Sequence, residues 1–431
     1  MATTFYDDRF RPSSPSADSQ SGGFRFDFRT FLVTMALVGI GLISVYSATY
    51  DSGASAIFQS QLMYAIAGLV VMLSVAFAPD RWLRLSSIPL YALGMLLLMA
   101  VLAIGTERYG QKNWIIIGSF SLQPSELMKI GTLMFSALFI SREGKSLTYW
   151  RDLGTLIAIV IIPVGLIMAG KDTGSATVYM VMLMAIAFWG GADLFLLFSL
   201  VAPAIIGLVA LLGSISGYGN IPLYVGLAAL LGAMLLFRRR MLPTMLAFGL
   251  SLAVGLSTPI IYDHLPPHMQ NRLATFLNPE LDPQGAGYHV IQSMLAVGGG
   301  GLSGKGFLQG TQTQLRYIPE QWTDFIFCVP TEEFGFLGGV LVIGLLVLLI
   351  WLAVDTANHL RSRFESTICF GIAAVIFYHM TINIGMAIGL VPVMGIPLPF
   401  LSKGGSSLLL NMFMIGLLLN FYRSRTDVRR F

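Results

Sequence analysis

The sequence has few charged residues and almost no cysteine. Of its 431 residues, 11% are charged and 55% are hydrophobic, whereas soluble globular proteins have about 25% charged residues. This balance excludes an ordinary soluble protein. The two cysteines, Cys328 and Cys369, lie in or beside apolar segments, so neither a disulfide framework nor a zinc site is predicted. The sequence also has no Walker loop and no HExxH motif, and we expect neither a nucleotide cofactor nor nucleic acid as a partner.

The charge-free stretches are long enough to cross a membrane. A transmembrane helix needs about 20 mostly apolar residues, and the apolar runs here are helical in length, unlike the short alternating segments of a barrel. The sequence therefore predicts an all-α polytopic integral membrane protein with about twelve transmembrane helices. The expected spans are residues 30–49, 60–78, 88–105, 123–141, 153–169, 174–190, 194–213, 221–237, 242–260, 330–354, 367–388 and 403–421.

Lysine and arginine predict the orientation, because they are enriched in cytoplasmic loops. With the amino terminus inside, most of the 26 Lys and Arg residues fall in inner segments, including the arginine run 238–240. Adding or removing one span would place that run or the basic carboxy terminus outside. We therefore expect both termini to be cytoplasmic. Residues 1–27 are predicted to be a disordered tail, residues 28–422 a transmembrane domain, and residues 423–431 a basic tail.

One outer connection, residues 261–329, is much longer than the others, and long loops concentrate function. A short amphipathic stretch at residues 288–297 predicts an interfacial or re-entrant helix within it. Asp282 lies in a turn rich in Pro and Gly just before this stretch, where a carboxylate is either part of the turn or catalytic. The Gly-rich segment around Lys305 predicts backbone N–H groups and an amine that approach a phosphate.

Ionisable residues at membrane depth are candidates for function because they are costly there. Glu126 and Lys129 are three residues apart, so they share a helix face and are expected to pair, either as a structural ion pair or as a substrate contact. Asp172 lies beside Lys171 in a tight turn, where it is expected to cap the next helix, to contact substrate, or both.

The end of the long outer loop carries a mixed aromatic and charged run. Arg316, Glu320 and Asp324 belong to this run, and Glu332 and Glu333 follow where the chain re-enters the membrane. An interfacial aromatic belt accounts for part of the pattern. Two adjacent acids at the start of a span are not explained in that way, and they indicate a functional site.

Taken in order, these motifs resemble the SEDS family of cell-wall proteins, which includes RodA, FtsW and SpoVE. The resemblance covers residues from roughly 30 to 422, and the run 310–315 is more like RodA than FtsW. The motifs that carry it are Gln123-Pro124-Ser125-Glu126, Asp172-Thr173-Gly174, Asn278-Pro279 with Asp282-Pro283 and Gly287-Tyr288, Pro319-Glu320 with Thr323-Asp324-Phe325 and Glu332-Glu333, Asn383-Ile384-Gly385-Met386, and Gly395-Ile396-Pro397-Leu398-Pro399 followed by Ser402 and Gly404-Gly405-Ser406.

The resemblance implies an inverting peptidoglycan glycosyltransferase in the bacterial cytoplasmic membrane. It would polymerise lipid II into glycan strands at the outer face, for cell elongation and shape. Its implied partners are a class B penicillin-binding protein and other membrane proteins of the elongation complex. The essential carboxylate of the family matches Asp282, which would act as the catalytic base. The residues that we expect to bind substrate are Lys112, Trp114, Glu126, Lys129, Asp172, Lys305, Arg316, Glu320 and Asp324.

The leaving pyrophosphate needs its charge stabilised. Lys112, Lys129, Lys305, Arg316 or a divalent cation, magnesium or manganese, would serve, although the sequence assigns no metal ligands. The chain also departs from the family pattern. It reads as twelve spans instead of the usual ten, with the surplus near residues 194–240. Asn113, Lys171, Trp322 and Lys403 stand where Arg, Pro, His and Tyr are common.

Three alternatives remain open on the sequence alone. A lipid II flippase would use the same outer charges, but an alternating-access transporter is expected to have a site near the membrane midplane, and the candidate carboxylates lie on one side. A division polymerase of the FtsW type shares the motifs. A non-catalytic scaffold of the wall-building complex is the third alternative.

Overall fold

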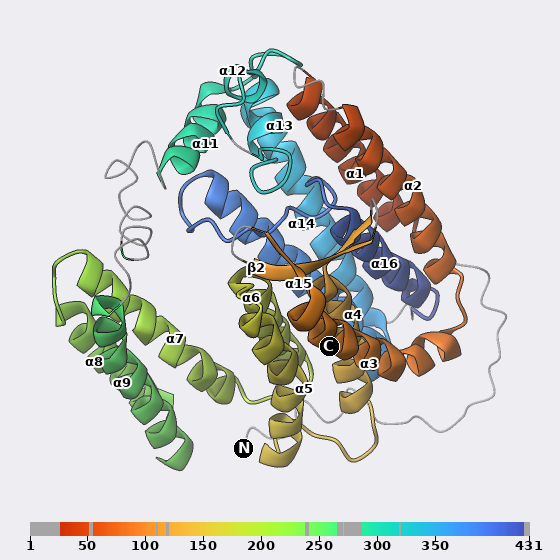
Figure 1. Ribbon diagram of the computed structural model, residues 1–431. Coiled ribbons are helices and arrows are strands. Elements are labelled where there is room, and N and C mark those ends of the chain that lie inside the picture. The colour runs from red at the N-terminus through yellow and green to blue at the C-terminus, as the bar shows by residue number, and fades with distance from the viewer. Residues whose placement is uncertain are drawn as a thin grey trace. The chain divides into compact units, whose positions relative to one another are not determined.

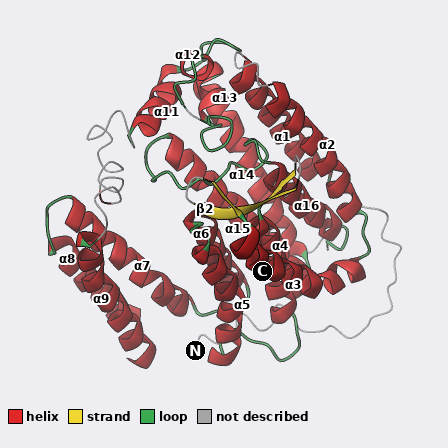
Figure 2. Cartoon of the chain, viewed as in Figure 1, coloured by secondary structure: helices red, strands yellow, loops and turns green. Residues whose placement is uncertain are grey.

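The structure is a computed structural model that describes residues 26–50, 55–108, 111–117, 120–237, 241–264, 270, 287–318 and 320–425. Most of these residues are helical (Figures 1 and 2). The chain divides into two units, unit 1 with Met1–Gly190 and Gln292–Phe431, and unit 2 with Gly191–Ile291. The helices are α1 (Phe28–Thr49), α2 (Ser55–Ala76), α3 (Asp80–Ile104), α4 (Pro124–Ile140), α5 (Trp150–Ala169), α6 (Thr173–Trp189), α7 (Leu194–Ile215), α8 (Ile221–Phe237), α9 (Met241–Asp263), α11 (Tyr288–Gly299), α12 (Thr311–Gln314), α13 (Cys328–Glu333), α14 (Gly335–His359), α15 (Arg363–Ala387) and α16 (Gly405–Tyr422).

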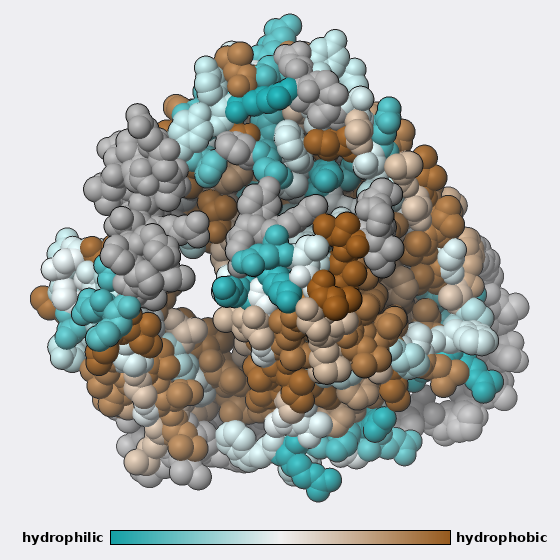
Figure 3. All heavy atoms as spheres, viewed as in Figure 1, coloured by the Kyte–Doolittle hydropathy of each residue, from teal (hydrophilic) through white to brown (hydrophobic). Residues whose placement is uncertain are grey.

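A helix occupies each range that was predicted to span the membrane. Among the described residues, nine helices are long and apolar enough to cross a bilayer, and α4, α6 and α8 are shorter. Large apolar side chains such as Leu93, Leu96, Leu337 and Leu341 are exposed on helix surfaces. Hydrophobic side chains cover the helices of unit 1, and hydrophilic ones gather near helix ends (Figure 3). The chain is thus a multi-pass membrane protein, and the count of twelve crossings stays a prediction.

Three short strands between α3 and α4 form an antiparallel sheet in the order β1 (Thr106–Arg108), β2 (Gln111–Ile117), β3 (Phe120–Leu122). No strands were predicted here from the sequence. The β-branched residues 115–117 favour a strand, but the run is short and adjoins a span. The backbone N–H of Lys112 donates to the carbonyl oxygen of Gly170 at 3.0 Å, which fastens the sheet to the turn between α5 and α6.

Hydrogen bonds at one end of unit 1 join the start of α3 to the start of α15, and the end of α16 to the end of α2. We call this the basic end. Arg84 Nη2 donates to Ser362 Oγ at 2.7 Å and lies 3.4 Å from Glu365 Oε1. Asn420 Nδ2 of α16 donates to the carbonyl oxygen of Val75 of α2 at 2.9 Å.

The opposite end of unit 1 joins the starts of α4 and α6 to each other and the end of α1 to α13. We call it the motif end. Gln123 Nε2, just before α4, donates to Asp172 Oδ2, just before α6, at 3.0 Å. Ser47 Oγ of α1 donates to Glu333 Oε1 of α13. Because consecutive helices alternate in direction, motifs that are far apart in the sequence lie at this one end.

The helices α4 and α3 approach closely because of a glycine. A Cβ added at Gly131 would lie 3.0 Å from backbone atoms of Leu90 and Tyr91, nearer than side chains ordinarily allow. Small residues permit this kind of packing between membrane helices. The first turns of α4, which carry Glu126 and Lys129, are therefore held against neighbouring backbone.

Unit 2 has a hydrophobic core of its own. The helices α7, α8 and α9 pack around a set of buried apolar side chains: Ala202, Ile206, Ala210, Leu223, Leu227, Leu230, Met234 and Ala247. A Cβ added at Gly255 of α9 would lie 2.5 Å from Leu223 Cδ1, so this glycine permits close packing of α9 on α8. The surplus spans near residues 194–240 fall within this unit.

Candidate functional site

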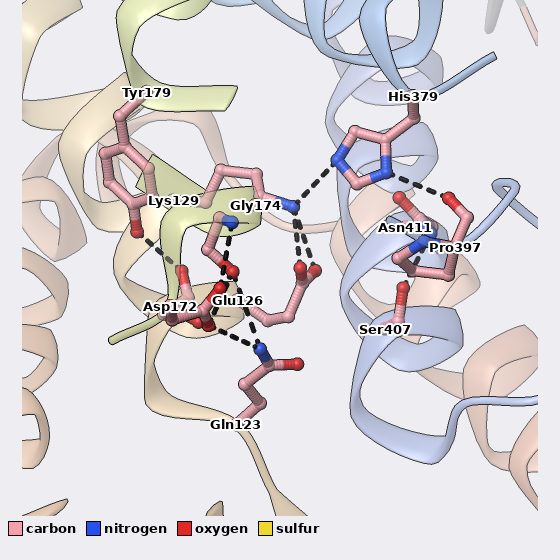
Figure 4. Close-up of polar contacts among 12 residues, drawn as sticks. Gln123, Glu126, Lys129, Asp172, Gly174, Tyr179, His379, Pro397, Ser407 and Asn411 are labelled. Atoms are coloured by element: carbon pink, nitrogen blue, oxygen red, sulfur yellow. Dashed lines mark hydrogen bonds and ion pairs between the residues drawn. The ribbon is translucent and has the colours of Figure 1, made fainter. Parts of the chain in front are cut away.

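One of the buried polar contacts at the motif end is an ion pair on α4 (Figure 4). Lys129 Nζ lies 2.9 Å from both carboxylate oxygens of Glu126, and 2% of Lys129 and 5% of Glu126 are exposed. Glu126 is in the first turn of α4, where the helix dipole favours a negative charge. The predicted pairing of these two residues is confirmed. Their burial inside the bundle agrees with the structural alternative for the pair.

The same ammonium group contacts α15. Lys129 Nζ lies 3.3 Å from His379 Nε2, and His379 Nδ1 lies 3.0 Å from the carbonyl oxygen of Pro397 (Figure 4). An ammonium group only donates, so Nε2 accepts, and the proton of the neutral ring is on Nδ1. These contacts connect α4, α15 and the segment 388–404 that joins α15 to α16.

Asp172 gathers donors from three elements. Its Oδ1 accepts the backbone N–H of Ser175 at 2.9 Å, and its Oδ2 accepts from Ser175 Oγ at 2.8 Å. Gln123 Nε2 at 3.0 Å and Asn113 Nδ2 at 3.1 Å also donate to Oδ2. The predicted helix cap is confirmed. Asp172 also fastens β2, through Asn113, and the start of α4 to α6.

The segment 388–404 is bonded to the end of the long loop. Asn383 Nδ2 donates to the carbonyl oxygens of Asp324 and Ile396, each at 2.8 Å. Ser402 Oγ donates to the carbonyl oxygen of Thr323 at 2.7 Å. Residues from three of the sequence motifs therefore meet through direct hydrogen bonds.

Asp324 carries a carboxyl group with a perturbed pKa. Burial and then the nearby Glu320 carboxylate raise the pKa of Asp324 from its usual 3.8 to about 6. Near neutral pH this group is therefore closer to its titration point than an ordinary aspartate is. Carboxyl groups of that kind are suited to proton transfer and are enriched at functional sites.

Glu332 is the centre of a second buried contact set. Its side chain is buried in α13 and accepts five hydrogen bonds, from Lys305 Nζ at 2.7 Å, Thr311 Oγ1 at 3.3 Å, Gln312 N at 2.8 Å, Thr313 N at 2.9 Å and Thr313 Oγ1 at 2.6 Å. Burial disfavours the charged form, but the bonds from Lys305, Thr313 and Gln312 outweigh it and lower the pKa of Glu332. The segment 305–313 is folded around this carboxylate.

The adjacent Glu333 is in a different environment. Its Oε1 accepts from Ser47 Oγ and from the backbone N–H of Leu308, the latter at 3.1 Å. Its Oε2 is buried and has no hydrogen-bond partner among the described residues. Burial raises the pKa of Glu333. This residue therefore ties α13 to the end of α1 without the full set of donors that Glu332 has.

Two backbone N–H groups of the Gly-rich segment have partners within the protein, and the approach of this segment to phosphate stays a prediction. The N–H of Lys305 donates to the carbonyl oxygen of Glu332 at 3.0 Å, and that of Gly306 to Glu333 at 2.9 Å. The Lys305 amine is paired with the Glu332 carboxylate. The segment turns back onto α13, and these donors are used there.

The remaining predicted residues are spread over the motif end. Lys112 Nζ donates to the carbonyl oxygens of Leu102 at 2.7 Å and Ala103 at 3.2 Å, so it caps the end of α3. Trp114 is half-buried on β2. Arg316 is exposed, with a φ of 55°, and its guanidinium makes no hydrogen bond or ion pair with another described residue. Glu320 is also exposed.

Several predictions lie outside the described residues. These are residues 278–283 with Asp282, the arginine run 238–240, Pro319 and most of both predicted tails. Over the part of the chain that the structure describes, no three His, Cys, Asp or Glu side chains come together as metal ligands. The described residues thus give no fit to a divalent cation, and we derive no step through one.

Several residues that complete these contacts were not predicted from the sequence. His379 is an ionisable residue within a predicted span, a signal that marks functional candidates. Ser47, Gln314 and Gln321 carry no such signal. Gln314 Nε2 donates to Ser47 Oγ at 3.1 Å, and Gln321 Nε2 donates to the carbonyl oxygen of Ala48 at 3.1 Å. Both tie the long loop to the end of α1.

The chain is similar in sequence to known proteins of the family that these motifs resemble. The chain is 33% identical over 423 residues to the peptidoglycan glycosyltransferase RodA of Treponema pallidum (strain Nichols), covering 92% of this chain and 97% of that protein. It is 34% identical over 407 residues to the stage V sporulation protein E of Bacillus subtilis (strain 168), covering 92% and 97%.

A solved structure is similar over almost the whole chain. It is described as "Structural coordination of polymerization and crosslinking by a peptidoglycan synthase complex". The TM-score is 0.70 at 26% identity, covering 94% of this chain and all of that one. A family model described as "Cell cycle protein" matches residues 28–222 and 223–427. These matches cover both units, and the chain therefore belongs to the FtsW, RodA and SpoVE family of cell cycle proteins.

Proposed function

We propose that this chain is a peptidoglycan glycosyltransferase that polymerises lipid II for cell elongation. The observation that carries the proposal is that several sequence motifs lie at the motif end, which holds the ion pair of Glu126 and Lys129, the Asp172 cap and the Glu332 contacts. Support comes from relatives named peptidoglycan glycosyltransferase RodA and MrdB, which match more than nine-tenths of the chain.

The motif end faces the outer side of the bacterial cytoplasmic membrane in this proposal, and both termini are cytoplasmic. Support comes from the cations of the basic end, where Arg84 and Arg425 are bonded to Glu365 and Asp355. Cytoplasmic ends of membrane proteins are enriched in Lys and Arg. Lipid II presents its sugars and pyrophosphate at a head-group surface, so a one-sided polar site fits this substrate.

The reaction joins the 4-hydroxyl of the acceptor sugar to the anomeric carbon of the donor and expels undecaprenyl pyrophosphate. A sugar hydroxyl is a poor nucleophile, and a positioned carboxylate that takes its proton is the expected help. We assign this role to Asp282. The proton of the acceptor hydroxyl moves to this carboxylate as the acceptor oxygen bonds to the anomeric carbon. The bond between the anomeric carbon and the pyrophosphate oxygen breaks, and its electron pair leaves with the undecaprenyl pyrophosphate.

The described contacts narrow the choice of cation for the leaving group. Lys112 is bonded to the end of α3, Lys129 to Glu126 and His379, and Lys305 to Glu332. Arg316 is exposed and lacks such a partner in the described part of the chain. We assign it the stabilisation of the pyrophosphate, because guanidinium groups bind phosphate oxygens in a bidentate manner. A divalent cation stays an expectation of the family resemblance.

We also propose that the chain works beside a class B penicillin-binding protein in the elongation complex. Support comes from the similar solved structure, whose description couples polymerisation with crosslinking. Copurification of this chain with the candidate transpeptidase from membranes tests the partner, and the absence of a complex at matched expression contradicts it.

Polymerisation of labelled lipid II by purified protein tests the activity. The wild type is expected to make glycan polymer, and Asp282→Asn is expected to be inactive although folded. Glu280→Gln is the matched control, because it removes one charge from the same segment and is expected to retain activity. Transport of lipid II across liposome membranes without polymer would support a flippase instead. If the protein neither polymerises nor transports lipid II, the result would support a scaffold.

A further inference from the structure

His379 is a buried ionisable side chain that the proposed chemistry does not use. Only 2% of it is exposed. Both ring nitrogens are engaged, Nε2 by Lys129 at 3.3 Å and Nδ1 by the carbonyl oxygen of Pro397 at 3.0 Å (Figure 4). A neutral imidazole satisfies both partners in one tautomer alone. The two partners therefore fix the orientation of the ring.

His379 also fixes the direction of the Lys129 ammonium group. That group has three N–H donors. Two lie toward the carboxylate oxygens of Glu126, each at 2.9 Å, and the third lies toward His379. Without the imidazole, one donor of a buried ammonium group would lose its partner, a costly state in a low-dielectric interior. The ion pair would then be free to reorient.

On its other side, His379 holds the segment 388–404. Asn383 lies four residues further along α15, so the two side chains share a helix face. They hold consecutive carbonyl groups, since Asn383 donates to Ile396 and His379 to Pro397. Asn383 also donates to the carbonyl oxygen of Asp324. The imidazole thus links the buried ion pair of α4 to the segment 388–404, and Asn383 joins that segment to the backbone of Asp324.

We propose that His379 is a positioning residue for the polymerase reaction. It holds the Glu126 and Lys129 pair and the segment 388–404 in one arrangement, and thereby keeps Asp324 at a fixed place in the site. This inference rests on the proposed function. Misplacement of a site by about 1 Å can cost about 100-fold in rate. The loss is expected in kcat, because His379 is buried and does not contact substrate.

Two substitutions and a control separate positioning from simple support of the fold. His379→Gln keeps one acceptor for Lys129 and one donor for Pro397, whereas His379→Leu keeps the bulk and removes both. Tyr378→Phe is the control. Tyr378 is the residue before His379 on α15, and the substitution removes a hydroxyl group that is hydrogen-bonded to Thr177 of α6. All three are compared with wild type for kcat and KM on lipid II.

His379→Leu is expected to lower kcat on the order of 10- to 100-fold with KM changed less than about 3-fold. His379→Gln and Tyr378→Phe are expected to stay within about 3-fold of wild type in both constants. Equal loss in the Gln and Leu variants, or wild-type kcat in the Leu variant, overturns the inference.

Hydrogen exchange gives a readout that needs no activity. The backbone N–H of Leu398 is bonded to Ser402 Oγ at 2.7 Å, one residue after Pro397. Exchange of this N–H is expected to be about 10-fold faster in His379→Leu and unchanged in His379→Gln. A tenfold change corresponds to a loss of about 1.4 kcal/mol in the free energy of local opening. If the wild type makes no polymer, the proposed function fails, and this measurement still decides whether His379 holds the segment 388–404. Equal exchange in all three proteins overturns the inference.

Discussion

Glu332 and Glu333 are adjacent and chemically identical, yet the structure predicts a large response to substitution by Gln at Glu332 and a small one at Glu333. Glu332→Gln replaces one acceptor oxygen with an NH₂ donor and removes the charge that pairs with Lys305. Every oxygen of Glu332 already accepts, so the new donor faces either the Lys305 amine or the Thr313 N–H and hydroxyl. At least two of the five hydrogen bonds are lost.

The cost follows from burial. Breaking a buried ion pair costs about 3–5 kcal/mol, and an unsatisfied buried donor about 1–3 kcal/mol. The Lys305 side chain is 28% exposed, so water compensates part of the loss. We therefore expect about 3 kcal/mol of local destabilisation, at the low end of that range.

Hydrogen exchange of the segment 305–313 in lipid nanodiscs measures this local stability. A loss of about 3 kcal/mol corresponds to about 100-fold faster exchange of the Thr313 amide. Glu333→Gln is the matched control. Its Oε2 has no partner in the described structure, so an NH₂ group there breaks no hydrogen bond. Burial already disfavours the charged form of Glu333, so loss of the charge offsets the cost of the unpartnered amide donor, and exchange is expected to change less than about 5-fold. Wild-type exchange in Glu332→Gln, or equal acceleration in both variants, would refute this reasoning.

The pH dependence of the same segment has a defined sign. The folded pKa of Glu332 is lowered, so its contribution to stability is present above the unfolded pKa of about 4.3 and is lost as the pH falls through the folded value. The folded pKa of Glu333 is raised, so acid relieves its burial cost. Protection of the Thr313 amide should fall in acid in the wild type, and Glu332→Gln should remove that dependence.

Three further substitutions test separate parts of the site. Lys112→Met removes the amine from the carbonyl groups that end α3 and is expected to destabilise by about 1 kcal/mol, seen as a lower Tm with an unchanged polymerisation rate. Arg316→Gln is expected to slow polymerisation on the order of 10- to 100-fold at an unchanged Tm, and an unchanged rate contradicts its assignment. Asp324→Asn removes a group whose folded pKa is raised to about 6. The wild type should therefore gain stability as the pH falls through about 6, whereas the variant should not, and identical pH profiles contradict this.

The helices were predictable because membrane-spanning segments must be long and apolar, and this constraint is local in the sequence. The pairing of Glu126 with Lys129 and the cap by Asp172 were predictable for the same reason, since each acts within one turn of a helix. The sheet at residues 106–122 was missed because its strands are short and adjoin a span.

The contacts between distant segments were not predictable. Lys129 and His379 are 250 positions apart, and Glu332 and Thr313 are 19 apart. Lys305 was expected to face phosphate because it is a cation among glycines, but the folded chain places it against a buried carboxylate. Which donor satisfies which acceptor depends on how the helices pack, and helical periodicity does not encode that.

The central claim is that this membrane protein builds glycan with a carboxylate from its long loop. The most direct measurement is polymerisation of labelled lipid II by purified wild type, Asp282→Asn and Glu280→Gln, each first shown to be folded by its Tm. We predict polymer from the wild type and Glu280→Gln and none from Asp282→Asn. Polymer from Asp282→Asn at the wild-type rate would contradict the account.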